Sequence, residues 1–173
     1  MGAVSVAIQT AFAGIAAASG PAYVVHGAVT NCSCGLRQSH VVVPISHGSF
    51  IHNTAQLTIQ DFVPVKNVQI FGGCTSSQNP SVQAAAAAIV KEVNSEPKSF
   101  WEKVAGIFCK SDETSDASFV SQCVGACTPM IVLPWSSGKK GVILDGARPL
   151  LYDATLVCTY GGVIKLETSG QPE

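Results

Sequence analysis

The feature that most constrains the fold is a set of cysteine-bearing turns spread along the chain. Residues 156–164 read Leu-Val-Cys-Thr-Tyr-Gly-Gly-Val-Ile, so two runs rich in β-branched residues flank Cys158 and a glycine pair. Because glycine adopts positive φ without strain, this stretch predicts a tight β-hairpin with a thiol at its neck. Three upstream turns, marked by glycine or proline, carry Cys32, Cys74 and Cys127. We therefore predict that long-range strand pairing joins four thiols in a structural metal centre.

The composition indicates one domain that works inside an assembly. The 173 residues are enough for a single hydrophobic core. Only 12% of them are charged, which is about half the usual share, and 47% are hydrophobic. Much of the surface is therefore expected to be neutral or covered by partners. With a net charge of −1 and dispersed basic residues, the sequence has no basic cluster of the kind that binds nucleic acid.

The cysteine count argues against a disulfide scaffold. Seven cysteines cannot all pair within one chain, and cysteine-rich secreted domains are usually shorter. A reducing, cytosolic setting in which cysteines bind metal is the preferred interpretation. Cys109 and Cys123 are expected to be ordinary thiols, with a disulfide between them as the alternative in an oxidising setting.

The N-terminal stretch 3–19 is apolar and rich in small residues. No Lys or Arg precedes Arg37, and Gln9 and Thr10 interrupt the apolar run, which argues against a signal peptide. The stretch is also short for a membrane span. We expect residues 1–21 to form a helical extension that docks on a neighbour, with a frayed terminus as the alternative.

The remaining pattern predicts a mainly β fold with a helical insertion. Short segments rich in β-branched residues alternate with turn residues, as in a meander or a folded-over sheet. These segments are 23–25, 41–43, 50–52, 57–59, 130–133 and 142–144.

One long helix and an insertion interrupt this β pattern. Asn79 and Pro80 are an N-cap and a first helical residue, and the alanines of 84–88 favour a helix through residue 93. A second helix from Ser99 and an acidic, serine-rich loop complete an insertion at about 93–122.

Short motifs follow these turns in a fixed order between residues 22 and 171. They are His26-Gly27-Ala28 before Cys32, Ser46-His47-Gly48, Asp61, Asn67-Val68, Gly72-Gly73-Cys74, Asn79-Pro80, Cys127-Thr128-Pro129, Pro134-Trp135 and the 158–164 hairpin. In this order they resemble the PAAR-like spike-tip proteins, relatives of the proline-alanine-alanine-arginine repeat proteins that cap contractile injection machines. The chain departs from the pattern at Phe62, where the family often has histidine, and at Ala126, which replaces a common proline.

The resemblance implies a non-enzymatic tip formed by residues 22–173 as a conical β structure. Its base would sit, as a monomer, on a trimeric VgrG-like spike protein, and its apex would puncture the target membrane. The host machine would be a type VI secretion system or an extracellular phage-tail-like particle. It would be assembled in the bacterial cytoplasm and its tip ejected or delivered to the target cell. The extension and the insertion would contact baseplate or effector cargo.

The resemblance also implies the ligand set of a structural zinc site. Cys32, Cys74, Cys127 and Cys158 match family cysteines, and structural zinc takes four N or S ligands. His47 is the chief substitute, followed by His52 and Cys34. The alternative is that these are buried, unreactive cysteines that bind no metal, since free cysteine is often buried.

Other functions receive less support from the residues. No cysteine lies in a nucleophile turn that opens a helix, and neither a serine elbow nor a metalloprotease helix motif is present, so we expect no enzyme. A free-standing metal-binding or redox-sensing β domain is the alternative to the tip. His26 and His40 are expected at the surface or in hydrogen bonds, and Trp101 and Trp135 in the core or at an interface.

Overall fold

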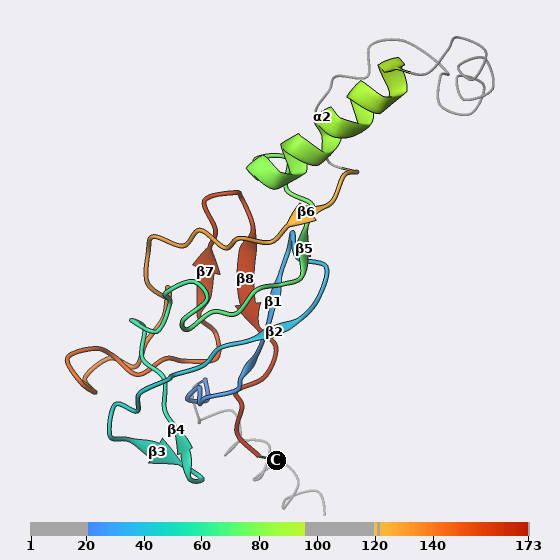
Figure 1. Ribbon diagram of the computed structural model, residues 1–173. Coiled ribbons are helices and arrows are strands. Elements are labelled where there is room, and N and C mark those ends of the chain that lie inside the picture. The colour runs from blue at the N-terminus through green and yellow to red at the C-terminus, as the bar shows by residue number, and fades with distance from the viewer. Residues whose placement is uncertain (1–20, 96–119, 121, 173) are drawn as a thin grey trace, which may run out of the picture.

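The computed structural model describes residues 21–95, 120 and 122–172. These residues form a mainly β structure with one long helix, which confirms the predicted fold class (Figure 1). The elements are β1 Val29–Cys32, β2 Ser39–His40, β3 Phe50–Ile51, β4 Thr54–Ala55, β5 Gly73–Cys74, α2 Pro80–Ser95, β6 Gly125–Ala126, β7 Thr155–Val157 and β8 Val163–Leu166. The predicted N-terminal helix within 3–19, the helix from Ser99 and Trp101 lie outside the described residues.

A four-stranded antiparallel sheet, in the order β2-β1-β8-β7, organises the body. Along β8, Ile164 and Leu166 are buried while Val163 and Lys165 are exposed, the period of two expected of a half-buried strand. The predicted hairpin that connects β7 to β8 is confirmed: the Cys158 amide donates to the Gly162 carbonyl at 2.8 Å.

Several predicted strands are single bridges, because glycine and proline turns leave too few extended residues for longer ladders. Residues Val41 and Ile131 each make one antiparallel bridge, to Val68 and Cys158. The predicted strand at 142–144 is wrong. Leu144 and Ala147 instead close a turn through two mutual backbone hydrogen bonds of 2.7 and 3.0 Å. The next two residues, Asp145 and Gly146, have φ values of 49° and 79°, which no strand accommodates.

The core lies between the sheet and the bridged segments and is centred on a tryptophan. Trp135 is 2% exposed and its indole N–H donates to the Asp61 carbonyl at 3.0 Å. It packs in one cluster with Phe71, Leu57 and Leu150, among others. The expectation of a core aromatic at Trp135 is therefore confirmed.

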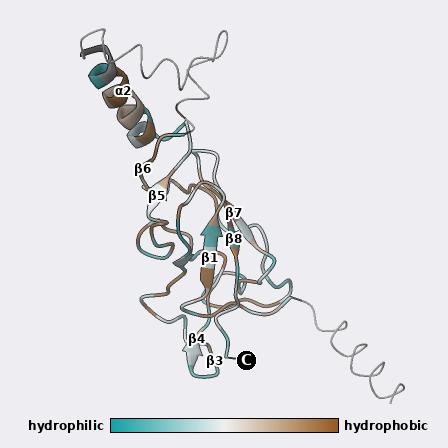
Figure 2. Ribbon diagram, turned by 90° about the vertical axis from the view of Figure 1, so that its right-hand side faces the viewer, coloured by the Kyte–Doolittle hydropathy of each residue, from teal (hydrophilic) through white to brown (hydrophobic). Residues whose placement is uncertain are grey.

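Helix α2 starts where the sequence predicts. The Asn79 side-chain oxygen accepts the Ser81 amide at 2.9 Å, as an N-cap does. The first turns of the helix pack on the body, where Val82 and Ala86 form a small buried cluster with Cys74 and Cys123. The rest of α2 projects away from the end that carries β5 and β6, and the β3–β4 hairpin lies at the opposite end (Figures 1 and 2). In the described part of the chain no helix is sufficiently long and apolar to cross a bilayer.

Candidate metal centre

Four thiols from distant segments line one small cavity. Cys32 ends β1, Cys74 ends β5, Cys127 follows β6 and Cys158 follows β7, and all four line a space of about 20 Å³. That volume holds about one water or one ion. The residues that the sequence singled out as the first ligand set thus meet at one place.

Strand register explains why they meet. Cys32 lies opposite Ile164 in the main sheet, while Cys74 lies opposite Gly125 in the β5–β6 pair. Cys158 forms an antiparallel bridge with Ile131, which follows Cys127 by four residues. Three separate strand pairings therefore hold the cysteines around the cavity, which forms only when the chain folds.

Two of the sulfur atoms accept backbone hydrogen bonds. The Ser76 amide lies 3.5 Å from the Cys74 sulfur, and the Met130 amide lies 3.5 Å from the Cys158 sulfur. These two backbone contacts hold the sulfur atoms in place beside the cavity.

Burial has the largest effect on the ionisation of Cys32. Desolvation raises the pKa of the Cys32 thiol, a hydrogen bond with the Cys34 backbone lowers it, and charge on Cys34, Cys158 or Cys127 raises it further. The neighbouring cysteines are therefore close enough to affect the ionisation of Cys32.

Cys127 behaves in the same way. Burial raises the pKa of its thiol, a hydrogen bond with the Phe71 backbone lowers it, and charge on Cys74 or Cys158 raises it. Without metal, the neutral thiol is favoured at both positions. Metal binding at this cavity would therefore release protons, and its affinity would rise with pH.

The donor set fits zinc in kind and number, but the side chains are not arranged as a metal site. Four cysteines, all free thiols, satisfy the closed tetrahedral set of a structural zinc site. Among the described residues, however, no three His, Cys, Asp or Glu side chains are already arranged to hold a metal ion. To hold an ion, the sulfur atoms would have to turn toward a common centre by rotation of the cysteine side chains about χ1.

Gly162 limits how the Cys32 sulfur is placed. A Cβ at Gly162 would lie 2.8 Å from that sulfur, closer than real contacts allow. We expect Gly162→Ala to displace the Cys32 thiol and to lower zinc content, although it removes no donor. Metal analysis of the purified variant measures this. Gly27→Ala strains the backbone at φ +87° but places its Cβ within 4 Å of no other atom, so this control should keep its zinc.

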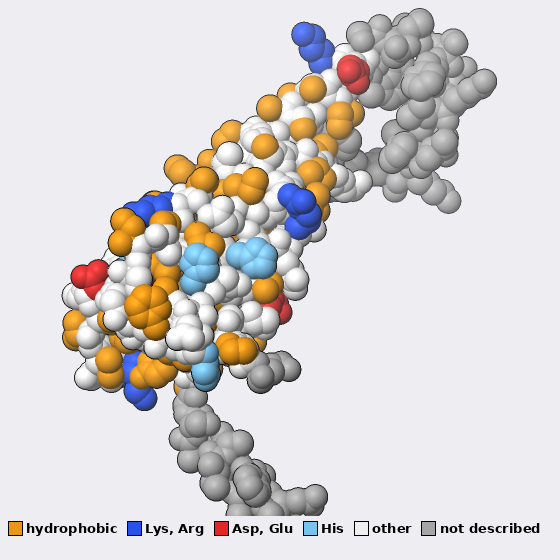
Figure 3. All heavy atoms as spheres, turned by 60° about the horizontal axis from the view of Figure 1, so that its bottom comes forward, with side chains coloured by type: hydrophobic (Ala, Val, Ile, Leu, Met, Phe, Trp, Pro, Cys, Tyr) orange, Lys and Arg blue, Asp and Glu red, His pale blue; other side chains and the backbone are white. Residues whose placement is uncertain are grey.

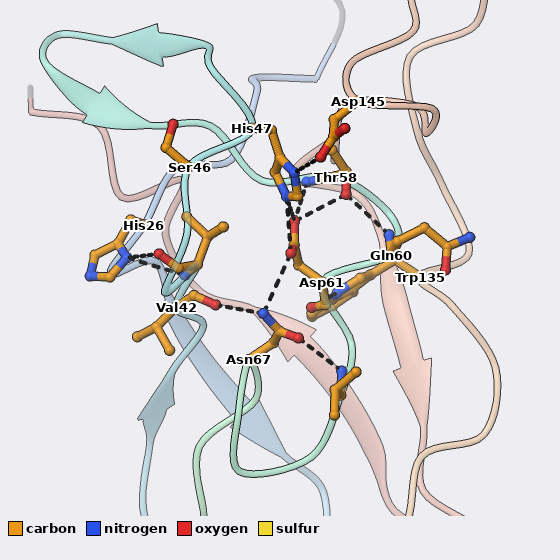
Figure 4. A network of polar contacts seen from close by, with 12 residues as sticks. His26, Val42, Ser46, His47, Thr58, Gln60, Asp61, Asn67, Trp135 and Asp145 are labelled. Atoms are coloured by element: carbon orange, nitrogen blue, oxygen red, sulfur yellow. Dashed lines mark hydrogen bonds and ion pairs between the residues drawn. The ribbon is translucent and has the colours of Figure 1, made fainter.

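The substitute ligands named from the sequence fall in different places. Cys34 lines the same cavity. His47 does not, because both of its ring nitrogens face carboxylates of Asp61 and Asp145 (Figure 4). His52 is exposed in the β3–β4 turn with φ 49°.

The other two histidines are exposed and hydrogen-bonded, as the sequence predicted. The Val43 amide donates to His26 Nδ1 at 3.1 Å, and His40 Nδ1 lies 3.2 Å from the Gly27 carbonyl oxygen. The sequence reasoning missed the partnership of His47 with Asp145, 98 residues away. No local pattern marks Asp145.

The span that holds both the cysteine cavity and the His47 contacts also matches a known family. The family model described as a domain of unknown function, DUF4280, matches residues 24–171. The chain belongs to the DUF4280 family. The residues matched in this DUF4280 protein include all four cysteines of the first ligand set, which line the cavity. Comparisons with curated proteins and with solved structures found no match.

Proposed function

We propose that this chain is a PAAR-like tip that caps the trimeric spike of a contractile injection apparatus and sharpens it for membrane puncture. The observation that carries the proposal is the meeting of Cys32, Cys74, Cys127 and Cys158 in one cavity. These are the cysteines that the motif resemblance selects, and membership of DUF4280 over 24–171 covers the span of that resemblance.

In this proposal the four cysteines hold a structural zinc ion. When bound, zinc cross-links the ends of β1, β5 and β7 and the segment after β6. A ligated ion in a small domain contributes on the order of 10 kcal/mol to folding. A tip that is pushed through a membrane has to resist unfolding under force, and cross-links between distant segments supply that resistance. The proposed role is structural, without catalysis.

The opposite end of the molecule supplies the surface for the spike. Ile45, Phe50 and Ile143 are exposed there, and Val142 and Ile143 line one groove together with Ile51 of β3. We call the four exposed residues Ile45, Phe50, Val142 and Ile143 the apolar end. Figure 3 shows hydrophobic side chains at the surface on this side of the molecule. An apolar surface of this kind favours a partner, and the spike trimer is the partner proposed for it.

Binding to the cognate spike tests the proposal. We expect the chain and the trimeric spike protein to elute together in size-exclusion chromatography, and Ile143→Glu to weaken that binding at least about tenfold by burying a charge. Val132→Glu is the matched control, because Val132 is 66% exposed and Ile143 is 68% exposed. Val132 lies beside Ile131, which bridges to Cys158 at the cysteine end, so its variant should bind as the wild type does.

A free-standing metal-binding or redox-sensing domain is the alternative, favoured by the five cysteines around one cavity. Zinc-loaded chain that fails to bind the spike trimer would support this alternative and contradict the tip. The tip proposal includes the host system and any effector cargo. The spike protein that binds this chain would identify both.

A further inference from the structure

His47 lies between two carboxylates and contacts both. Its Nδ1 is 2.9 Å from Asp145 Oδ2, and its Nε2 is 2.9 and 3.1 Å from the two oxygens of Asp61 (Figure 4). A neutral imidazole has one N–H and can donate to one of these groups only, whereas an imidazolium donates to both. The geometry therefore favours a protonated ring.

The electrostatics of the site agree with that geometry. Burial lowers the pKa of His47, but hydrogen bonds with Asp145 and Asp61 and the charges of both carboxylates outweigh it, so the pKa is raised above its ordinary value. Asp61 and Asp145 are the charged groups that act on the ring among the described residues. The His47 and Asp61 side chains are 17% and 8% exposed, so solvent screens that pair only in part.

The two carboxylates are held very differently. One oxygen of Asp61 accepts both the amide and the hydroxyl of Thr58, at 2.7 and 3.0 Å, and the other lies 3.4 Å from the Asn67 side-chain amide. Asp145 lies in the 144–147 turn and its side chain is 66% exposed. Asp61 is thus a fixed anchor, whereas Asp145 depends on His47 for its position.

We propose that His47 is a proton-operated clamp that fastens the 142–147 segment to the 44–49 loop and to the Asp61 anchor. With the ring protonated, both carboxylates are held. Loss of the proton leaves one nitrogen without N–H, opposite a carboxylate oxygen, and the exposed Asp145 is the partner that is released. The 142–147 segment then loosens while the Asp61 anchor remains in place.

The clamp controls the apolar end. Ile45 lies two residues before His47, and Val142 and Ile143 lie just before Asp145. The three side chains are therefore carried by the two segments that the clamp joins. Their relative placement changes with the protonation of one histidine, a property that the proposed spike-capping function does not require.

The direction of the pH effect follows from the raised pKa of His47. A histidine whose pKa is higher in the folded than in the unfolded state contributes stability fully below the unfolded value, about 6.5. That contribution is lost as pH rises through the folded value. The clamp is therefore closed below about pH 6.5 and opens as the pH rises through the folded-state pKa of His47.

The test combines NMR titration of His47 with melting temperatures between pH 5.5 and 8.5. We expect His47 to titrate above 6.5 in the wild type and closer to 6.5 in Asp145→Asn, a variant of an exposed side chain. The wild-type melting temperature should fall by a few degrees across this range. His47→Gln should lose that fall, whereas His40→Gln should keep it.

His40 is the matched control because its exposed ring contacts a backbone carbonyl and, among the described residues, no carboxylate. A His47 that titrates at or below 6.5, or an unchanged pH profile in His47→Gln, would overturn the clamp. If His47→Gln does not fold, the titration in wild type and Asp145→Asn decides, since neither measurement needs that variant.

Discussion

Cys158→Ser is expected to lose its zinc and a large part of its thermal stability. The wild-type chain should purify with close to one zinc, because four thiols around one cavity supply the ligands of a structural site. Serine removes one thiolate and leaves three, while the surrounding hairpin keeps its backbone bond to Gly162. If zinc contributes on the order of 10 kcal/mol, its loss lowers the melting temperature by tens of degrees. Metal analysis and thermal melting, with and without chelator, measure both effects.

Cys34→Ser is the control that separates ligands from neighbours. Cys34 lines the same cavity but lies outside the proposed ligand set, so its variant should keep the zinc and melt near the wild type. Zinc loss in Cys34→Ser with retention in Cys158→Ser would assign the ligands differently. Wild-type protein without metal, and with melting unchanged by chelation, would refute the zinc centre and leave the tip proposal to the spike-binding experiment.

The cavity also lies at the base of the projecting helix. Asn79 lines the cavity, caps α2 and donates from its side-chain amide to the Ala126 carbonyl at 3.0 Å. A Cβ at Gly125 would lie 2.5 Å from the Val82 amide nitrogen, so β6 and the first turn of α2 are in tight contact. Loss of structure around the cysteines is therefore expected to loosen the packing of α2 on the body.

Local chemistry made part of this fold predictable. The glycine pair at 161–162 favours a reversal, because Gly161 takes positive φ without strain, and Asn79-Pro80 is a favoured start for a helix. The meeting of the four cysteines was predictable for a different reason. Their turns occur in an order that resembles a known family, and that order carries the long-range pairing that spacing alone does not encode.

The features that the sequence did not predict depend on tertiary contacts. Residues 142–144 are β-branched or aliphatic and favour a strand, but Asp145 and Gly146 take positive φ and turn the chain toward His47. His47 resembled a metal ligand because histidine serves both roles. Its two carboxylate partners, 14 and 98 residues away, determine which role the fold permits.

Trp135→Ala is the substitution with the next largest expected effect, and it tests the core that positions both sites. Among the described residues, Trp135 is the largest of the fully buried side chains, and its indole donates to the backbone of Asp61, the anchor of His47. Removing the ring leaves a cavity and an unpaired buried carbonyl, which costs about 3–5 kcal/mol. We expect a lower midpoint in chemical denaturation and a His47 titration closer to 6.5, because the Asp61 turn loses its support.

Trp135→Phe separates the two contributions of the indole. Phenylalanine keeps much of the packing and loses the N–H, so this variant should lose less stability than Trp135→Ala while it still shifts the His47 titration. Equal stability losses in the two variants would mean that the hydrogen bond to Asp61 dominates. An unchanged His47 titration in both would show that the anchor is held by Thr58 and Asn67 alone, and that the core and the clamp are independent.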